Sequence, residues 1–236
     1  MHVSLSEVES TISKAVMGVG LPVGLGDEAG LAARHMMGAG LGIGTLFENA
    51  LQAVDQNRSV GFKIDNSCPV RFTPDINGLL LSSIISGPSA FDLASLITIE
   101  KGEPATVTLS RVDVPGIILF EALANTLDAP LGHCVSWNRT GKRSVKAICW
   151  DGSLYLIKGV PVELLMGGPS DITITPILEK PSNKGIKFEP RAQDAAIEID
   201  APSWQKIKTY ADRLFVGSTE TSRLFGAGSG GLIETD

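Results

Sequence analysis

Apolar residues in the first 55 positions recur at steps of three and four, which is typical of amphipathic helices. The first set comprises Leu5, Val8, Ile12, Ala15, Val16 and Val19. Ser4-x-x-Glu7 and Ser6-x-x-Glu9 both match the capping box that begins many helices. The pattern therefore predicts one amphipathic helix at the start of the chain.

Two further helices follow, separated by the glycine-rich segments Gly18–Gly26 and Gly38–Gly44. We expect Asp27 to cap the second helix. Its apolar stripe consists of small side chains and methionines, at Ala29, Ala32, Ala33, Met36 and Met37. Such a stripe favours close helix packing. Thr45-x-x-Glu48 predicts a capping box for a third helix, which carries Leu46, Phe47, Ala50, Leu51 and Val54.

From about Val60 the pattern changes to β-branched runs bounded by Pro, Gly and Asn, which predicts strands. The clearest runs are Gly78–Ile85, Ala105–Ser110 and Asp171–Pro176. Residues 145–150 and 153–157 flank Asp151-Gly152, a dipeptide that supplies the positive φ angles of a two-residue type I′ turn. This segment is the clearest hairpin.

One helix interrupts the predicted strands and another follows them. Pro115 suits a first helical position, and apolar residues follow it with helical spacing up to Leu127. The last helix starts near Pro202, and a Ser/Thr/Gly-rich tail begins at Gly217. We predict one α+β domain over residues 1–236, with a helical N-terminal lobe (1–55), a mostly antiparallel sheet (60–200), and a C-terminal helix with a docked Gly-rich tail (201–236).

Composition and charge narrow the class of partner. Lys and Arg number 20 against 26 Asp and Glu, a net charge of −6, which gives no electrostatic case for binding nucleic acid. The longest uncharged stretch, Ile76 to Phe91, is too short and too polar to span a bilayer. The N-terminus lacks a signal-peptide pattern, and three widely spaced cysteines give no disulfide framework, so we expect a cytoplasmic protein. Only 19% of residues are charged, which together with the small-residue helices suggests a homo-oligomer.

Most motifs for cofactors, metals and nucleophiles fail on context. Gly226–Gly231 fits G-x-G-x-x-G, but only five residues remain for the helix that a dinucleotide site needs, and no P-loop is present. We therefore expect no cofactor. The three histidines and three cysteines lack metal-ligand spacing. His133 and Cys134 are neighbours on a predicted strand and would point to opposite faces. Ser203-x-x-Lys206 stands where helix-start serines are common, so catalysis there is the weaker interpretation.

A basic run without an acidic residue falls in the predicted hairpin region, at Arg139, Lys142, Arg143 and Lys146. Such a run could meet a phosphate or an acidic partner. In a chain of net charge −6, a solvated hairpin loop is the favoured interpretation.

The C-terminal tail mixes apolar residues with hydroxyls, glycines and an arginine, so we expect it to be docked. It could lend Thr219, Ser222 or Arg223 to an anionic ligand, or it could be a clasp that only completes the core. These two interpretations carry equal weight. The candidate ligand-binding residues are Arg34, Arg71, Glu220, Ser222 and Arg223.

Three segments carry a resemblance to a known family. They are Gly24-Leu-x-x-Glu28-Ala-Gly30-x-Ala-x-Arg34, Gly87-Pro-Ser-Ala-Phe-Asp92 and Thr219-Glu-x-Ser222-Arg223-x-x-Gly226-Ala-Gly228. The chain resembles a bacterial family catalogued only as a domain of unknown function, which implies a soluble bacterial protein and brings no known activity. It departs from the family pattern at Gly217 and at its last residues, Ile233–Asp236. The first 50 residues are also similar to malate/lactate dehydrogenases of the non-Rossmann type, but they lack the Ser-His-Gly of those enzymes.

Two classes of function remain. In the first class, the protein binds or transforms a small anionic metabolite. This class is favoured because glycines, hydroxyls and arginines gather at both ends of the chain. Alternatively, it is a non-catalytic subunit, which should expose an apolar patch and have no convergent polar pocket.

Overall fold

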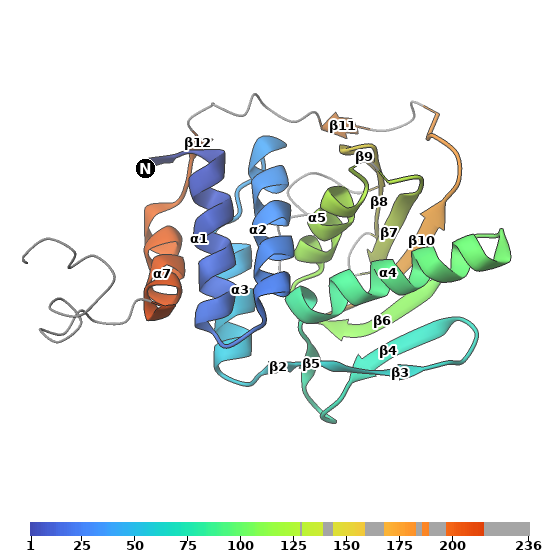
Figure 1. Cartoon of the computed structure of the whole chain (residues 1–236), viewed down its shortest axis with the longest axis horizontal. Helices are drawn as coiled ribbons and strands as arrows, with labels where there is room; N and C mark the ends of the chain where they lie inside the picture. Colours follow the sequence, from blue (N-terminus) through green and yellow to red (C-terminus); the bar gives the residue numbers. More distant parts are fainter. Residues whose placement is uncertain (128, 139–143, 159–167, 183–185, 189–196, 215–236) are drawn as a thin grey trace, which may run out of the picture.

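The computed structural model describes residues 1–127, 129–138, 144–158, 168–182, 186–188 and 197–214. Figure 1 shows a bundle of helices on one side of the molecule and a mixed sheet on the other, with α4 and α5 against the sheet. The α+β class is therefore as predicted, with helices at the N-terminal end and a C-terminal helix. The tail from Gly217 lies outside the described residues.

The bundle consists of α1 (Leu5–Gly18), α2 (Val23–Gly38), α3 (Gly44–Asp55) and α7 (Ala201–Ala211), with a 3₁₀ turn at Asp212–Leu214. Ser4 caps α1, as predicted, by accepting a hydrogen bond from the Glu7 N–H. The small side chains of α2 allow close packing on α1, since a Cβ at Gly30 would lie 2.6 Å from the Glu9 carbonyl oxygen. The small-residue stripe of α2 is buried within the chain, so it no longer supports the prediction of a homo-oligomer.

Two predicted helix starts were wrong. Helix α2 begins at Val23, after Pro22, and Asp27 lies within it and accepts a hydrogen bond from the Ser13 hydroxyl. Helix α3 follows Ile43 and has no side-chain cap. Glu48 pairs with Lys206 of α7. In both cases the side chain that the sequence pattern assigned to capping, Asp27 or Glu48, instead bonds to a residue of another helix.

The main sheet has ten strands among the described residues: β2 (Ser59–Val60), β3 (Phe62–Asp65), β4 (Val70–Pro74), β5 (Leu80–Leu81), β6 (Val107–Val112), β7 (Gly132–Asn138), β8 (Ser144–Trp150), β9 (Ser153–Lys158), β10 (Ser170–Ile177) and β11 (Ile186–Phe188). The order is β11-β9-β8-β7-β10-β6-β4-β3, and β5 joins β6 to β2. Most pairs are antiparallel, and β4 and β5 run parallel to β6. A separate two-stranded sheet pairs β1 (His2–Val3) with β12 (Ile197–Glu198).

The predicted β8–β9 hairpin is confirmed. Asp151 and Gly152 connect the strands with φ angles of 46° and 64°, the left-handed values that a type I′ turn needs. This turn fixes the register as far as Ala147 and Leu156, after which the register shifts by one residue and Lys146 pairs with Lys158.

Helix α4 (Ser83–Lys101) was not predicted, because we expected a strand through Gly78–Ile85. Only Leu80–Leu81 is a strand, and the helix runs through Pro88. Pro88 lies in the second turn of α4. The apolar residues of α4 are spread around the helix, so the sequence gives no clear helical face. Helix α5 (Pro115–Asn125) begins at Pro115 as predicted.

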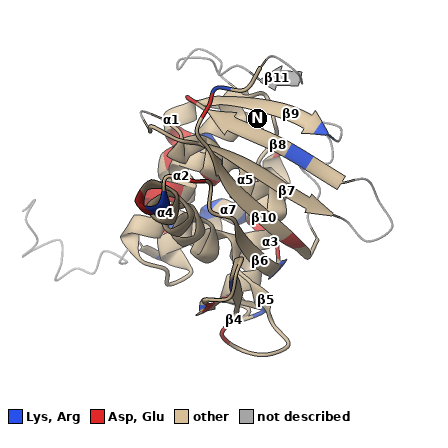
Figure 2. Cartoon of the chain, turned by 90° about the vertical axis from the view of Figure 1, so that its right-hand side faces the viewer, with Lys and Arg blue, Asp and Glu red and all other residues tan. Residues whose placement is uncertain are grey.

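Helices α4 and α5 cover one face of the sheet, and α2 packs on the outer side of α5. Val135, Ala147 and Ile174 on that face are fully buried. The opposite face carries hydroxyls and charged side chains, and Figure 2 shows basic positions on β8 and β9. None of the described helices is both long and apolar enough to cross a bilayer.

Candidate functional site

A row of polar residues crosses the uncovered face of the sheet. Each residue of the row is the direct cross-strand partner of the next. From one end to the other they are Lys158 (β9), Lys146 (β8), Ser136 (β7), Thr173 (β10), Thr108 (β6) and Arg71 (β4). Directly opposite residues share a face, so cations stand at both ends of this row and hydroxyls between them.

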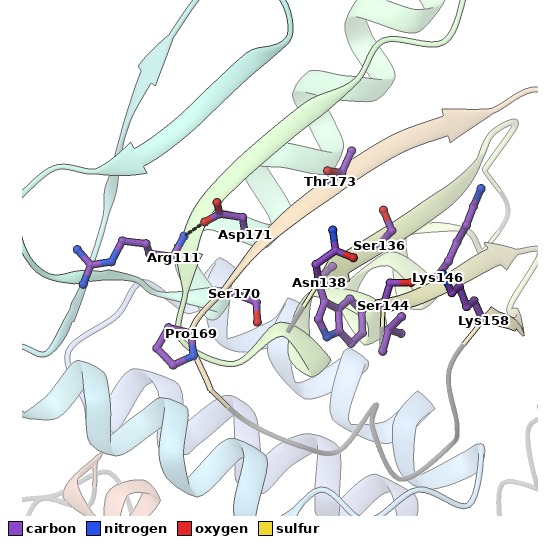
Figure 3. A pocket seen from close by; sticks show the side chains of 12 residues that line it. Arg111, Ser136, Asn138, Ser144, Lys146, Lys158, Pro169, Ser170, Asp171 and Thr173 are labelled. Atoms are coloured by element: carbon purple, nitrogen blue, oxygen red, sulfur yellow. Dashed lines mark hydrogen bonds between the residues drawn. The ribbon is translucent and has the colours of Figure 1, made fainter. Parts of the chain in front are cut away.

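A cavity of about 570 Å³ lies over the β9 end of the row. Its lining combines hydroxyls, three cations and one carboxylate: Arg111, Ser136, Trp137, Asn138, Ser144, Val145, Lys146, Lys158, Pro169, Ser170, Asp171 and Thr173. Figure 3 shows Ser136, Thr173 and Lys146 pointing to the same side of the sheet. Hydroxyl and ammonium groups that converge in this way are hydrogen-bond donors for an anion.

Lys146 and Lys158 are the centre of the positive charge in this cavity. Like charges directly opposite each other on neighbouring strands repel. Both side chains are exposed, and the described residues offer neither one a carboxylate partner. An anion placed between the two ammonium groups would remove their repulsion.

Arg111 and Asp171 form a structural unit at the edge of the cavity. Arg111 has a φ of 57°, at the place where the register between β6 and β10 shifts. Its backbone N–H donates to Asp171 Oδ1 (2.8 Å), and its guanidinium donates to the Gly78 carbonyl (3.2 Å). Figure 3 shows the guanidinium directed away from Lys146 and Lys158. The Asp171 carboxylate thus satisfies a backbone donor that the bulge leaves unpaired.

The cavity lies beside the basic run that the sequence singled out. Asn138 and Ser144, which flank residues 139–143, both line it, and Lys146 belongs to the run. Arg139, Lys142 and Arg143 lie outside the described residues. Trp137 alternates with Ser136 along β7, so its buried indole lies with Val135 on the face that the helices cover, and its Nε1–H has no acceptor among the described residues.

Of the sequence-predicted ligand residues, the structure describes Arg34 and Arg71, and it places these two apart. Arg34 is engaged in an ion pair with Glu9 (2.6 Å) on the helical side of the molecule. Arg71 lies on the same polar row as Lys146, but four strand spacings of 4.7–4.9 Å separate them by roughly 19 Å. Glu220, Ser222 and Arg223 fall outside the described residues, so their role stays a prediction.

The residues considered as nucleophiles or metal ligands do not form a catalytic or metal site among the described residues. His133 is buried on the covered face and Cys134 lies on the other, as the strand alternation predicts. Burial raises the pKa of Cys134, against a smaller opposing effect of Lys146, so the thiol stays protonated at neutral pH. Ser203 donates its backbone N–H to the Asp200 cap, as a helix-start serine does. Among the described residues, no cluster of three or more His, Cys, Asp or Glu side chains could hold a metal ion.

Asp113 has a structural role. Its Oδ1 accepts the backbone N–H groups of Ser83 (2.9 Å) and Val114 (2.6 Å), at the starts of α4 and α5. Burial raises its pKa, and these hydrogen bonds oppose that effect. This carboxyl therefore joins the beginnings of the two helices that cover the sheet.

Sequence reasoning missed Lys158, Ser136 and Thr173. The available signal was the alternation of hydroxyls along the predicted strands, which indicates one polar sheet face. The register that aligns them with Lys146 depends on pairing between strands far apart in sequence, such as Thr173 with Ser136.

Two sequence comparisons bear on the identity of the chain. Residues 3–72 match the model of a family described as "Protein of unknown function (DUF3726)". This match confirms the expected resemblance to a domain of unknown function and includes the Gly24–Arg34 segment. A stretch of 103 residues is 35% identical to 2-C-methyl-D-erythritol 4-phosphate cytidylyltransferase of Parasynechococcus marenigrum (strain WH8102). That stretch covers 39% of this chain and 46% of the enzyme, so the chain spans less than half of the enzyme's length.

The fold is similar to those of several dehydrogenases. A dehydrogenase of Sinorhizobium meliloti superposes with a TM-score of 0.61 at 10% identity, covering 89% of this chain and 99% of that one. Sulfolactate dehydrogenase of Methanocaldococcus jannaschii gives 0.59 at 10% identity, with coverage of 90% and 97%. A putative malate/lactate dehydrogenase of E. coli gives 0.58 at 13% identity, with coverage of 94% and 97%. At these identities the likeness shows a shared fold.

Proposed function

We propose that this protein binds a small anionic metabolite with two acidic groups over the Lys146–Lys158 pair of the open sheet face. The observation that carries the proposal is the direct cross-strand pairing of these two lysines beside the hydroxyl of Ser136. Two ammonium groups and converging hydroxyls match a dianion such as a dicarboxylate or a phosphate ester.

The names of the similar proteins support this class of ligand. Malate and sulfolactate each carry two acidic groups, and the cytidylyltransferase is named for a phosphorylated substrate. The proposal concerns recognition. The side chains of the polar row that line the cavity are hydrogen-bond donors. The one carboxylate in the lining, that of Asp171, accepts a hydrogen bond from the Arg111 backbone N–H.

Isothermal titration calorimetry with succinate and with inorganic phosphate tests the proposal. Lys146→Gln and Lys158→Gln should each weaken binding about tenfold or more, because each removes a charge-assisted hydrogen bond. Lys63→Gln on β3 is the matched control, since it changes the net charge equally at an exposed position away from the cavity. Equal weakening by all three substitutions would indicate a general charge effect and contradict the proposed site.

A second candidate function is that of a non-catalytic subunit. Leu96 and Ile99 on α4 are 54% and 63% exposed, and they lie together beside Leu131 on the surface. An exposed apolar patch on a helix favours a protein contact, either with a second copy of the chain or with another subunit. This patch lies on the helical side of the sheet, away from the lysine pair.

A further inference from the structure

Glu121 is a buried carboxyl without a partner in the helical layer. It lies on α5, where every residue from Pro115 to Leu123 is buried, and it is only 4% exposed. Neither of its carboxyl oxygens has a hydrogen-bond partner among the described residues. A buried polar group left unsatisfied destabilises the fold, so a carboxyl here calls for an explanation that packing does not give.

The position of this carboxyl depends on a glycine of the facing helix. A Cβ at Gly87 of α4 would lie 1.7 Å from Glu121 Oε2 and 2.9 Å from Ile118 Cδ1. The carboxyl therefore occupies the space that a side chain at position 87 would fill. A larger residue at this crossing would displace the acid, so Gly87 and Glu121 act as a matched pair.

Glu121 stands at the wall of a small cavity between α2, α4 and α5. The cavity has a volume of about 280 Å³, just below the range of about 300–1,000 Å³ that is usual for ligand pockets, so it suits a small ligand. Its lining is apolar apart from two acids and one amide: Glu28, Leu31, Pro88, Phe91, Glu121, Ala124, Asn125 and Leu127. Among these lining residues there is no Lys or Arg to neutralise the acids.

The charged groups that act on Glu121 are both carboxyls, those of Glu28 and Asp113. Glu28 reaches the cavity from α2, and Asp113 precedes α5. Burial raises the pKa of Glu121 well above its ordinary value, and the charges of Glu28 and Asp113 raise it further. The pKa of Glu28 is raised too, by burial and then by Asp92 of α4. A positive ligand group would relieve all of these repulsions.

The amide of Asn125 adds a polar group one helical turn after Glu121. Its Oδ1 is 3.0 Å from His133 Nε2, which holds the amide in place from the sheet side. Burial lowers the pKa of His133 to about 4, so the imidazole is neutral at pH 7 and brings no positive charge to the cavity. The site therefore combines acids and a fixed amide with apolar walls.

We propose that this cavity binds a primary ammonium group on a small apolar body, with the Glu121 carboxylate as its buried counter-ion and Glu28 at the entrance. The apolar walls of Leu31, Phe91 and Leu127 favour an alkyl chain over a hydrated metal ion, which would need several oxygen ligands. The site lies on the helical side of the sheet and is independent of the lysine pair.

Calorimetric titration of the whole protein with n-butylammonium at pH 8 tests this proposal. n-Butanol is the neutral control of similar shape, and butyrate is the anionic control. We expect butylammonium alone to bind.

Glu121→Gln should weaken butylammonium binding at least about tenfold, because it removes the charge that pairs with the ammonium group. This variant should fold, because it replaces a buried acid by a neutral side chain of similar size. Glu100→Gln, at an exposed position of α4, is the charge-matched control and should bind as the wild type does. Equal affinity for n-butanol, unchanged affinity in Glu121→Gln, or no binding at millimolar concentration would overturn the proposal.

Discussion

Lys146 and Lys158 are direct cross-strand neighbours on β8 and β9, on a sheet face that no described helix covers. The Asp151-Gly152 turn sets the register as far as Ala147 and Leu156. A shift of one residue beyond that pair brings Lys158, rather than Ile157, opposite Lys146. An irregularity in the strand pairing thus places two like charges together, and the repulsion between them is a cost that an anionic ligand would remove.

This repulsion predicts an effect on stability in the absence of ligand. Lys146→Glu should convert it into an attraction and raise the melting temperature by up to about 3 °C at low salt. At an ionic strength of about 1 M, where the Debye length is about 3 Å, the gain should largely disappear. Thermal unfolding followed by circular dichroism at both salt concentrations measures this, with Lys63→Glu as the control. A gain that persists at high salt would show that its cause is not charge repulsion.

The close packing of α1 on α2 predicts opposite effects for two glycines of α2. Gly30→Ala places a Cβ 2.6 Å from the backbone oxygen of Glu9, which cannot move aside like a side chain, and should cost about 1–3 kcal/mol. Gly24→Ala has nothing within 4 Å and should stabilise the protein by up to about 1 kcal/mol through helix propensity. Urea unfolding of the two variants measures both effects. Equal effects of the two substitutions would contradict the packing described for this helix pair.

His133 predicts a loss of stability in acid. Burial lowers its pKa from 6.5 to about 4, so between these values the unfolded chain binds a proton that the folded protein does not. Stability should fall as the pH drops from about 6.5 toward 4, by up to about 3 kcal/mol from this residue. Unfolding free energies at pH 7 and pH 5 measure the effect in the wild type and in His133→Gln. The hypothesis fails if the variant keeps the full acid sensitivity of the wild type.

The exposed apolar residues of α4 predict self-association. Light scattering should give a mass above 24.8 kDa at micromolar concentration. The double substitution Leu96→Lys and Ile99→Lys should shift the mass toward the monomer, because charges at an apolar contact oppose its burial. Leu178→Lys changes another exposed leucine, outside α4, and should leave the mass unchanged. A monomeric wild type would contradict both this interface and the expected homo-oligomer.

Local signals predicted much of the fold. Helix α5 begins at Pro115 and α7 at Asp200–Pro202 because the first turn of each is encoded by adjacent residues. Helix α4 was missed because its apolar residues are spread around the helix, which is a consequence of packing on several sides rather than of a helical period.

The candidate sites were harder to predict, because they depend on contacts between distant segments. Lys146 was singled out within a basic run, but its neighbours Ser136 and Thr173 come from β7 and β10. Arg34, chosen for its charge, is neutralised by Glu9 from another helix. Glu121 gave no signal in the sequence, because only the fold shows that it faces Gly87 without a partner.

The most direct test of the central claim is to observe the lysine ammonium groups during titration with an anion. In protein with ¹⁵N-labelled lysine side chains, the NMR signals of Lys146 and Lys158 should shift together along one saturating curve as succinate is added. The signals of Lys63 and Lys101, which lie outside the cavity, should stay in place. Small shifts of all lysines in proportion to succinate concentration, or no shift of Lys146 and Lys158, would contradict the proposed anion site.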